Sequence, residues 1–136
     1  MTKHSVHQKF IHWILIGAAS VTLLLVGCQP SNLASITPNE AATMFSEQQA
    51  IIVDVREDSE WNEEHIAGAI HIPLAQVENR LSELAQYKNS TVITQCRSGK
   101  RSAKAAGMLQ AAGFNKVLNL TGGIIAWNND GLKTTK

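Results

Sequence analysis

Short apolar runs alternate with helix-like segments along this chain of 136 residues, and this alternation limits the possible folds more than any other feature. The run at 50–56 is apolar until it ends in charge, as expected of a strand that is covered on both faces. Residues 91–95 and 116–120 have the same character. Strands separated by helices predict an α/β domain with three layers, in which a parallel sheet carries helices on both faces.

Helix signals fill the segments between these runs. Thr37, Pro38 and Glu40 predict a capped start for a helix at 38–47, because the threonine and glutamate form a capping box. Apolar residues at helical spacing predict an amphipathic helix at 74–85. The remaining predicted elements are a short helix at 57–64 with Trp61 facing inward, a short strand ended by Pro73, a helix at 102–112 ended by Gly113, and a closing helix at 124–128.

Cys96 lies between the predicted strand at 91–95 and the helix that follows it. Its loop contains Arg97, Ser98, Gly99, Lys100 and Arg101. Free backbone N–H groups and the positive end of a helix dipole both favour a thiolate at such a junction. An inert buried cysteine is the alternative, but charged and glycine-bearing neighbours favour an exposed, activated thiol. We therefore predict a nucleophile at Cys96 and an anion-binding loop around it.

Two charged clusters are expected to meet at one edge of the sheet. Asp54 and Arg56 end one predicted strand, and Cys96 follows another. Ligands of parallel sheets bind beyond the carboxyl ends of the strands. The sequence therefore places Asp54 and Arg56 near the Cys96 loop, either as structural support or in the chemistry itself.

The N-terminus has the layout of a bacterial lipoprotein signal peptide, with basic, apolar and small-residue zones in order over residues 1–27. The apolar zone closes on Cys28, which would carry the lipid, and residues 28–36 would form a tether. An uncleaved membrane anchor is the alternative. Either arrangement exports the domain to the periplasmic face of a membrane. Gln29 after the lipidated cysteine favours the outer membrane by the usual sorting rule.

Composition excludes some functions and makes Cys96 more notable. Apolar residues make up 44% of the chain and charged residues 17%, as in a globular domain, and the net charge of +1 gives no reason to expect a nucleic-acid partner. The chain has two cysteines. If Cys28 carries lipid, Cys96 has no disulfide partner in an oxidising compartment, and a lone thiol there favours a function.

Taken together, the motifs resemble those of a single-domain rhodanese, a member of the sulfurtransferase family, over residues 37–133. The motifs, in family order, are Asp54-Val55-Arg56, Glu60-Trp61, His65-Ile66-Ala67-Gly68-Ala69, Cys96-Arg97-Ser98-Gly99-Lys100-Arg101-Ser102, Ala111-Ala112-Gly113-Phe114 and Gly122-Gly123-Ile124. The resemblance implies that Cys96 accepts a sulfane sulfur from thiosulfate or a similar donor, forms a persulfide and passes the sulfur to cyanide or a thiol. It implies no cofactor and no metal.

Three other functions are compatible with parts of the pattern. A phosphatase or arsenate reductase of related fold needs five residues between its cysteine and arginine, whereas only four separate Cys96 from Arg101. A non-catalytic persulfide carrier would use the same cysteine. An inert domain used for interaction would not need the intact loop.

Overall fold

The computed structural model describes residues 33–136, and its centre is a single sheet of five parallel strands in the order β1-β5-β4-β2-β3. The strands are β1 (Ser35–Ile36), β2 (Ala50–Asp54), β3 (Ile70–His71), β4 (Thr91–Gln95) and β5 (Lys116–Leu120). The helices are α1 (Pro38–Ser46), α2 (Asp58–Glu63), α3 (Lys100–Ala111) and α4 (Gly123–Asn129), with 3-10 segments η1 (Leu74–Gln76) and η2 (Glu78–Tyr87). The predicted α/β class with a parallel sheet is confirmed.

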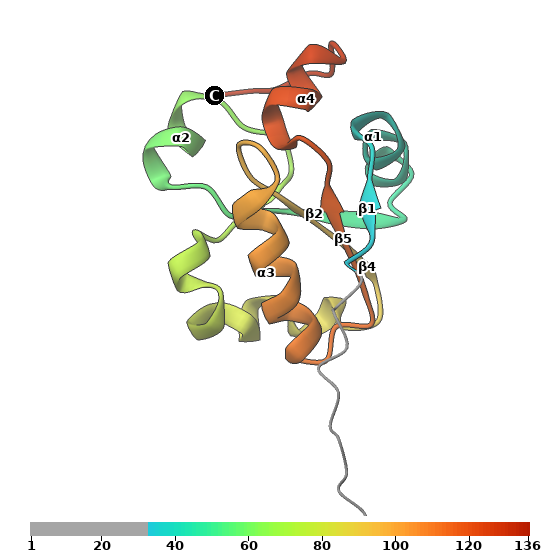
Figure 1. Cartoon of the computed structure of the whole chain (residues 1–136), viewed down its shortest axis with the longest axis vertical. Helices are drawn as coiled ribbons and strands as arrows, with labels where there is room; N and C mark the ends of the chain where they lie inside the picture. Colours follow the sequence, from blue (N-terminus) through green and yellow to red (C-terminus); the bar gives the residue numbers. More distant parts are fainter. Residues whose placement is uncertain (1–32) are drawn as a thin grey trace, which may run out of the picture.

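Two apolar clusters cover the two faces of the sheet and make the three layers. Val92 of β4 belongs to the cluster under α3 and the 3-10 segments, and the next residue, Ile93, belongs to the cluster under α1 and α4. Successive side chains of a strand point to opposite faces, so a strand buried on both sides is apolar throughout. Figure 1 shows α3 and α1 on opposite sides of the central strands.

The start of α1 follows the sequence prediction closely. The Glu40 backbone N–H donates to the Thr37 hydroxyl at 3.4 Å, and the Thr37 backbone N–H donates to the Glu40 carboxylate at 3.1 Å. This reciprocal pair is the predicted capping box, and Pro38 occupies the first helical position.

The predicted amphipathic α-helix at 74–85 is wrong. The chain instead forms η1 and η2, and Arg80 interrupts the second segment with φ −114° and ψ 16°. The Arg80 side chain contacts Glu83 and Gln76, so local polar contacts accompany the break. Val77 and Leu84 are still buried, so the segment keeps the apolar face that its sequence predicts although its backbone is not an α-helix.

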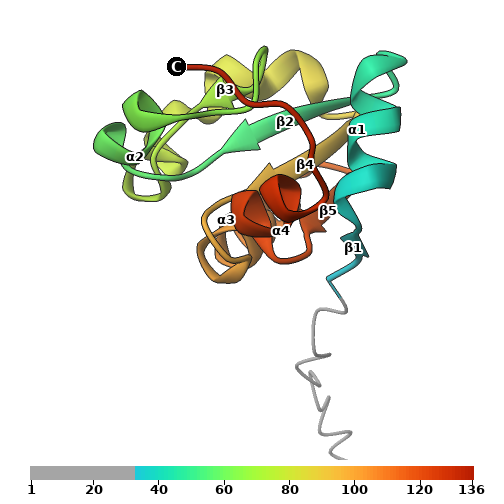
Figure 2. The ribbon, with the colours of Figure 1, turned by 90° about the horizontal axis from the view of Figure 1, so that it is seen from above.

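Both ends of the folded body extend beyond the predicted boundaries. Residues 35–36, assigned to the tether, form β1 and pair with Asn119 and Leu120 of β5. At the other end, Thr135 bridges His65 through two backbone hydrogen bonds of 2.8 Å each. Figure 2 shows the C-terminal segment running from α4 toward α2 and β3. Tertiary pairing of such short segments leaves no pattern in the local sequence.

Trp61 does not face the core as predicted. It is half-buried and lies between two imidazole rings, with its ring centroid 3.8 Å from that of His65 and 4.6 Å from that of His71. The stack ties α2 to β3 and to the connection between them. Trp127, by contrast, is buried in the cluster under α4, as predicted.

Candidate active site

Cys96 follows β4 directly and is only 1% exposed, so the expected exposure of this thiol is wrong. Its sulfur is nevertheless surrounded by donors. The Gly99 backbone N–H lies 3.2 Å from Sγ and the Ser102 hydroxyl 3.3 Å from it. Cys96 is therefore a buried thiol with hydrogen-bond donors directed at its sulfur, which distinguishes it from an inert core cysteine.

Opposing effects act on the thiol. Burial raises the pKa of Cys96, while hydrogen bonds from the Ser102 hydroxyl and from the backbone of Ser102, Ser98 and Gly99 lower it. The hydrogen bonds prevail, and the pKa lies below its ordinary value. The thiolate form needed for nucleophilic attack is thus favoured.

The N-terminus of α4 holds the loop in place from the neighbouring element. The Ile124 backbone N–H donates to the Cys96 carbonyl at 2.8 Å, and the Ile125 N–H donates to the Arg97 carbonyl at 3.3 Å. Gly123 makes this approach possible. A Cβ atom there would lie 2.3 Å from the Cys96 carbonyl oxygen, and the residue has a φ of +60°. Only glycine fits both demands.

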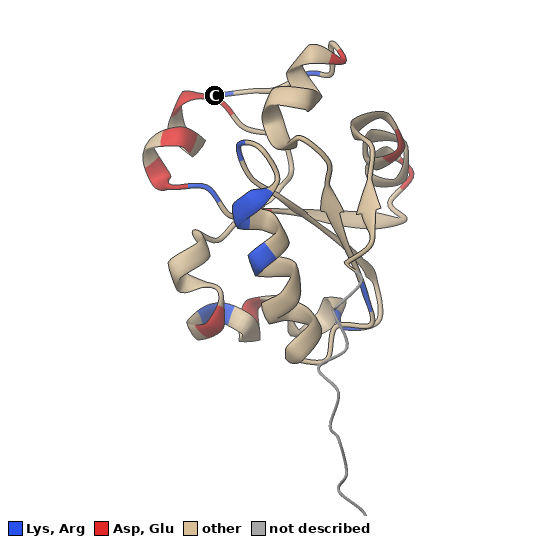
Figure 3. Cartoon of the chain, in the orientation of Figure 1, with Lys and Arg blue, Asp and Glu red and all other residues tan. Residues whose placement is uncertain are grey.

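The three loop cations have different surroundings. Arg101 donates to both carboxylate oxygens of Glu60 on α2, at 2.7 and 2.8 Å, and so its guanidinium is already occupied. Arg97 and Lys100 are exposed and make no side-chain ion pair within the described residues. Figure 3 shows the basic start of α3 and the acidic α2 on the same side of the molecule. Arg97 and Lys100 are thus available to an anion.

Asp54 and Arg56 form a buried ion pair beside the loop. Two N–H groups of the Arg56 side chain donate to the Asp54 carboxylate at 2.6–3.0 Å, and the guanidinium also reaches the Glu64 carbonyl at 2.8 Å. The pair lies near the loop because β2 and β4 are adjacent in the sheet, with Asp54 opposite Gln95. Neither side chain contacts the Cys96 sulfur, so the geometry favours structural support over direct chemistry.

The sequence and the fold both match known proteins. The family model for the rhodanese-like domain matches residues 37–130. The chain belongs to the rhodanese-like family. It is 39% identical to a sulfurtransferase of Allochromatium vinosum over 62% of this chain and 78% of that protein. It is 37% identical to the thiosulfate sulfurtransferase PspE of Escherichia coli over 52% and 67% respectively.

A solved rhodanese-like structure has the same fold. The rhodanese-like domain protein of Staphylococcus aureus is 33% identical, with a TM-score of 0.66 over 76% of this chain and 100% of that one. The chain spans about half the length of two other relatives, 56% of a Synechocystis protein and 43% of YrkF from Bacillus subtilis. At the level of the family, these matches support sulfur transfer.

This rhodanese-like loop differs from a phosphate-binding loop in the position of its arginine. Arg101 is directed to Glu60 rather than over the loop amides, which disfavours the phosphatase and arsenate reductase alternatives. Within residues 33–136, no group of three or more His, Cys, Asp or Glu side chains is placed to hold a metal ion.

Sequence reasoning missed several residues that shape the rhodanese-like site. The sequence presents Ser102 only as the end of a motif, and its patterns do not assign Asn119 or Gly123 to the site. Asn119 contacts both the loop and α3, through the Gly99 carbonyl and the Ser102 hydroxyl. Its position near the carboxyl end of β5, next to β4, is a signal that could have identified it, because parallel strands bring these ends to one edge.

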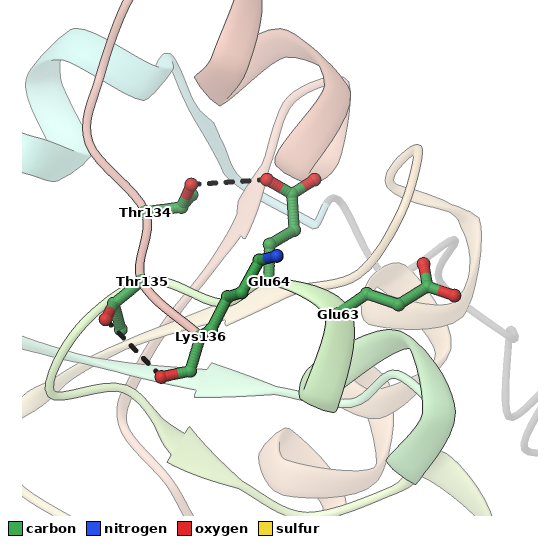
Figure 4. A pocket seen from close by; sticks show the side chains of 5 residues that line it. All are labelled: Glu63, Glu64, Thr134, Thr135 and Lys136. Carbon is green, nitrogen blue, oxygen red and sulfur yellow. Dashed lines mark hydrogen bonds between the residues drawn. The ribbon is translucent and has the colours of Figure 1, made fainter.

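Cys28 and the predicted signal peptide lie outside the described residues. Among residues 33–136, no helix has the length and apolar character needed to cross a membrane. A shallow pocket beside α2 is lined by Glu63, Glu64, Thr134, Thr135 and Lys136, and in Figure 4 the Thr134 hydroxyl points to the Glu64 carboxylate, 3.2 Å away. This pocket contains none of the predicted site residues.

Proposed function

We propose that this chain is a thiosulfate sulfurtransferase that works through a persulfide on Cys96. The observation that supports it most directly is the convergence of the Gly99 N–H and the Ser102 hydroxyl on the Cys96 sulfur. These donors stabilise a sulfur anion before the reaction and whenever the thiolate is regenerated. The names of the Allochromatium and Escherichia relatives support the same chemistry.

The proposed cycle has two displacements at sulfur. In the first, the Cys96 thiolate attacks the outer sulfur of thiosulfate; a new S–S bond forms while the S–S bond of thiosulfate breaks, and sulfite leaves with the bonding pair. In the second, cyanide or an acceptor thiolate attacks the outer sulfur of the persulfide, and Cys96 leaves as a thiolate. Burial of Cys96 favours a donor that presents its transferable atom at the end of a small anion, as thiosulfate does.

The charged groups around the loop would assist in different ways. Arg97 and Lys100 are exposed and attract the thiosulfate dianion, while the amides of Ser98 and Gly99 face the sulfur. Arg101 acts on Cys96 by its charge while bound to Glu60. Asp54 and Arg56 support the adjoining strand end.

Intact-protein mass spectrometry tests the persulfide. The full chain carrying Cys28→Ser, which leaves Cys96 as its single thiol, is incubated with thiosulfate in detergent. We expect a mass gain of one sulfur atom, which cyanide removes as thiocyanate. The matched Cys28→Ser/Cys96→Ser chain should gain nothing, and a gain in that chain would refute the assignment. Repeated turnover of thiosulfate and cyanide separates an enzyme from a persulfide carrier, which would accept sulfur only from a partner protein.

We also propose that the domain is exported and held at the periplasmic face of a membrane, with the outer membrane favoured, by lipid on Cys28. The support comes from the basic, apolar and small-residue zones that end at this cysteine. Metabolic labelling with an alkyne fatty acid should mark the unmodified chain and the Cys96→Ser chain equally, and should fail with Cys28→Ser. Equal labelling of the Cys28→Ser chain would remove the basis for this proposal.

A further inference from the structure

The Ser102 hydroxyl lies between two acceptors and can satisfy only one of them at a time. Ser102 is fully buried on α3. Its Oγ is 3.3 Å from the Cys96 sulfur and 2.6 Å from Oδ1 of Asn119. A hydroxyl has a single hydrogen to donate, so the sulfur and the asparagine oxygen compete for it. The contact with Asn119 is at the short end of the range for O–H···O hydrogen bonds.

The orientation of the Asn119 amide is fixed from its other side. Its Nδ2 donates to the Gly99 carbonyl at 3.1 Å. Turning the amide over would place two carbonyl oxygens against each other, with no hydrogen between them. Oδ1 therefore faces Ser102, and Asn119 contributes an acceptor, not a donor, to the hydroxyl that approaches the sulfur.

We propose that Asn119 is a positioning residue that sets the reactivity of Cys96 by competing with its sulfur for the Ser102 hydroxyl hydrogen. In the thiol form, the Cys96 S–H donates to Ser102 Oγ and the Ser102 hydrogen goes to Asn119. In the thiolate form, the Ser102 hydrogen turns to the sulfur and Asn119 Oδ1 loses its donor. Ionisation thus releases one proton from sulfur to solvent and costs the Ser102–Asn119 hydrogen bond.

The same competition affects the sulfur-loaded state, and this step rests on the proposed function. In the persulfide, Sγ is bonded to carbon and to the outer sulfur, and the negative charge lies on the outer sulfur. Sγ is then a poor acceptor, and the Ser102 hydrogen returns to Asn119. Asn119 therefore favours the loaded state over the free thiolate, and its removal makes Cys96 a better leaving group when sulfur is passed on.

The charged groups near the sulfur are separate from this arrangement. Arg101 on α3 acts on Cys96 by its charge and is paired with Glu60 on α2. On the β2 side, Asp54 and Arg56 are paired with each other. Within the described residues, Asn119 is hydrogen-bonded to Ser102 and to the Gly99 carbonyl and not to these four side chains or to the exposed loop cations Arg97 and Lys100. A change in the titration of Cys96 on its substitution therefore reports on the hydrogen-bond network.

The test is the pH dependence of iodoacetamide alkylation in the full chain carrying Cys28→Ser, with no sulfur donor present. Asn119→Leu is similar in size and has no acceptor, so Ser102 is left to the sulfur alone. The variant also removes the donor to the Gly99 carbonyl, and the double variant described below separates that effect from the competition for the Ser102 hydrogen. We expect it to lower the pKa of Cys96 and to raise the alkylation rate on the acidic side of that pKa by roughly three- to tenfold, the effect of one hydrogen bond. Ser102→Ala should change the rate in the opposite direction.

The chain that carries both Asn119→Leu and Ser102→Ala shows whether Asn119 acts on Cys96 through Ser102 or only supports the loop. If Asn119 acts through Ser102, Asn119→Leu has no effect on the alkylation profile of the Ser102→Ala chain. An equal shift in both backgrounds, or no decrease in the pKa of the single variant, overturns the proposal. These measurements need no persulfide, so a chain that fails to accept sulfur from thiosulfate still tests the role of Asn119.

A measurement on the unsubstituted network covers the case in which the Asn119 variants do not fold. The side-chain carbonyl carbon of Asn119, followed by NMR in the Cys28→Ser chain, should shift with the titration of Cys96, because Oδ1 loses its donor in the thiolate. A carbonyl shift that stays constant through that titration would rule the competition out.

Discussion

The pair formed by Asp54 and Arg56 is the most deeply buried charge in the described residues, with 0% and 3% exposure. Asp54→Ala removes the carboxylate. The Arg56 guanidinium then keeps only two partners, the backbone carbonyls of Glu60 and Glu64. Breaking such a pair typically costs about 3–5 kcal/mol of unfolding free energy. Urea denaturation should show a loss of this size, and a loss near that of an exposed pair would contradict the structural role.

The exposed loop cations give a prediction about substrate binding. Arg97→Ala and Lys100→Ala should each raise KM for thiosulfate about three- to tenfold, because each removes attraction for a dianion, and should leave kcat less affected. The effect should fade with added salt. Lys104→Ala, an exposed lysine further along α3, is the matched control. An equal rise in KM for that control would assign the effect to net charge instead of the loop.

Individual residues of the site could be predicted where their type alone carries chemistry. Cys96 was found because a cysteine followed by glycine and cations at a strand end is distinctive. The burial of Cys96 could not be predicted in the same way. Its charged neighbours point outward, while its sulfur turns inward to Gly99 and Ser102. Glu60 and Asn119 were missed as partners, since their contacts join residues 41 and 20 positions apart and local sequence contains no trace of such a pairing.

At the scale of elements, the close approach of the start of α4 to the Cys96 loop predicts that a single added methyl group at Gly123 is harmful. Gly123→Ala would place Cβ against the backbone of Cys96 and Arg97 and would require a strained φ. We expect both a lower unfolding free energy and a displaced loop, seen as a loss of sulfur transfer. Gly107→Ala, in the interior of α3 with nothing within 4 Å of its Cβ position, should instead stabilise the chain by about 0.5–1 kcal/mol. Similar effects of the two substitutions would contradict the close approach at Gly123.

Elements with strong local signals were predicted, and elements defined by tertiary contacts were not. The cap at Thr37 and the apolar runs of β2, β4 and β5 match the structure, because their causes lie within the segments themselves. β1 exists only through its pairing with β5, and so the local sequence of its two residues predicts a tether instead of a strand. The choice of 3-10 over α geometry after Pro73 depends on the break at Arg80, which the spacing of apolar residues does not show.

At the scale of the whole molecule, the carboxyl edge of the sheet gathers segments that are far apart in the chain. α2 follows β2, the Cys96 loop follows β4 and α4 follows β5, and all three strands are parallel neighbours. The pair of Glu60 and Arg101 joins α2 to the start of α3 across this edge. The pair therefore helps to align two elements beside the site, and acid should weaken the pair.

The pair of Glu60 and Arg101 predicts how the unfolding free energy of the domain changes in acid. Arg101 lowers the pKa of Glu60 from 4.5 to about 2. A carboxylate with a lower pKa in the folded state stabilises the fold at pH above the unfolded value, and this contribution is lost as pH falls from about 4.5 toward 2. Because both side chains are partly exposed, we expect about 1–2 kcal/mol. Glu60→Gln should lose that amount near neutral pH, and its unfolding free energy should fall less steeply with acid. Glu63→Gln, which removes a carboxylate from the same helix without touching the pair, is the matched control. Parallel acid profiles for the Glu60→Gln chain and the unsubstituted chain would show that the pair does not join the two elements.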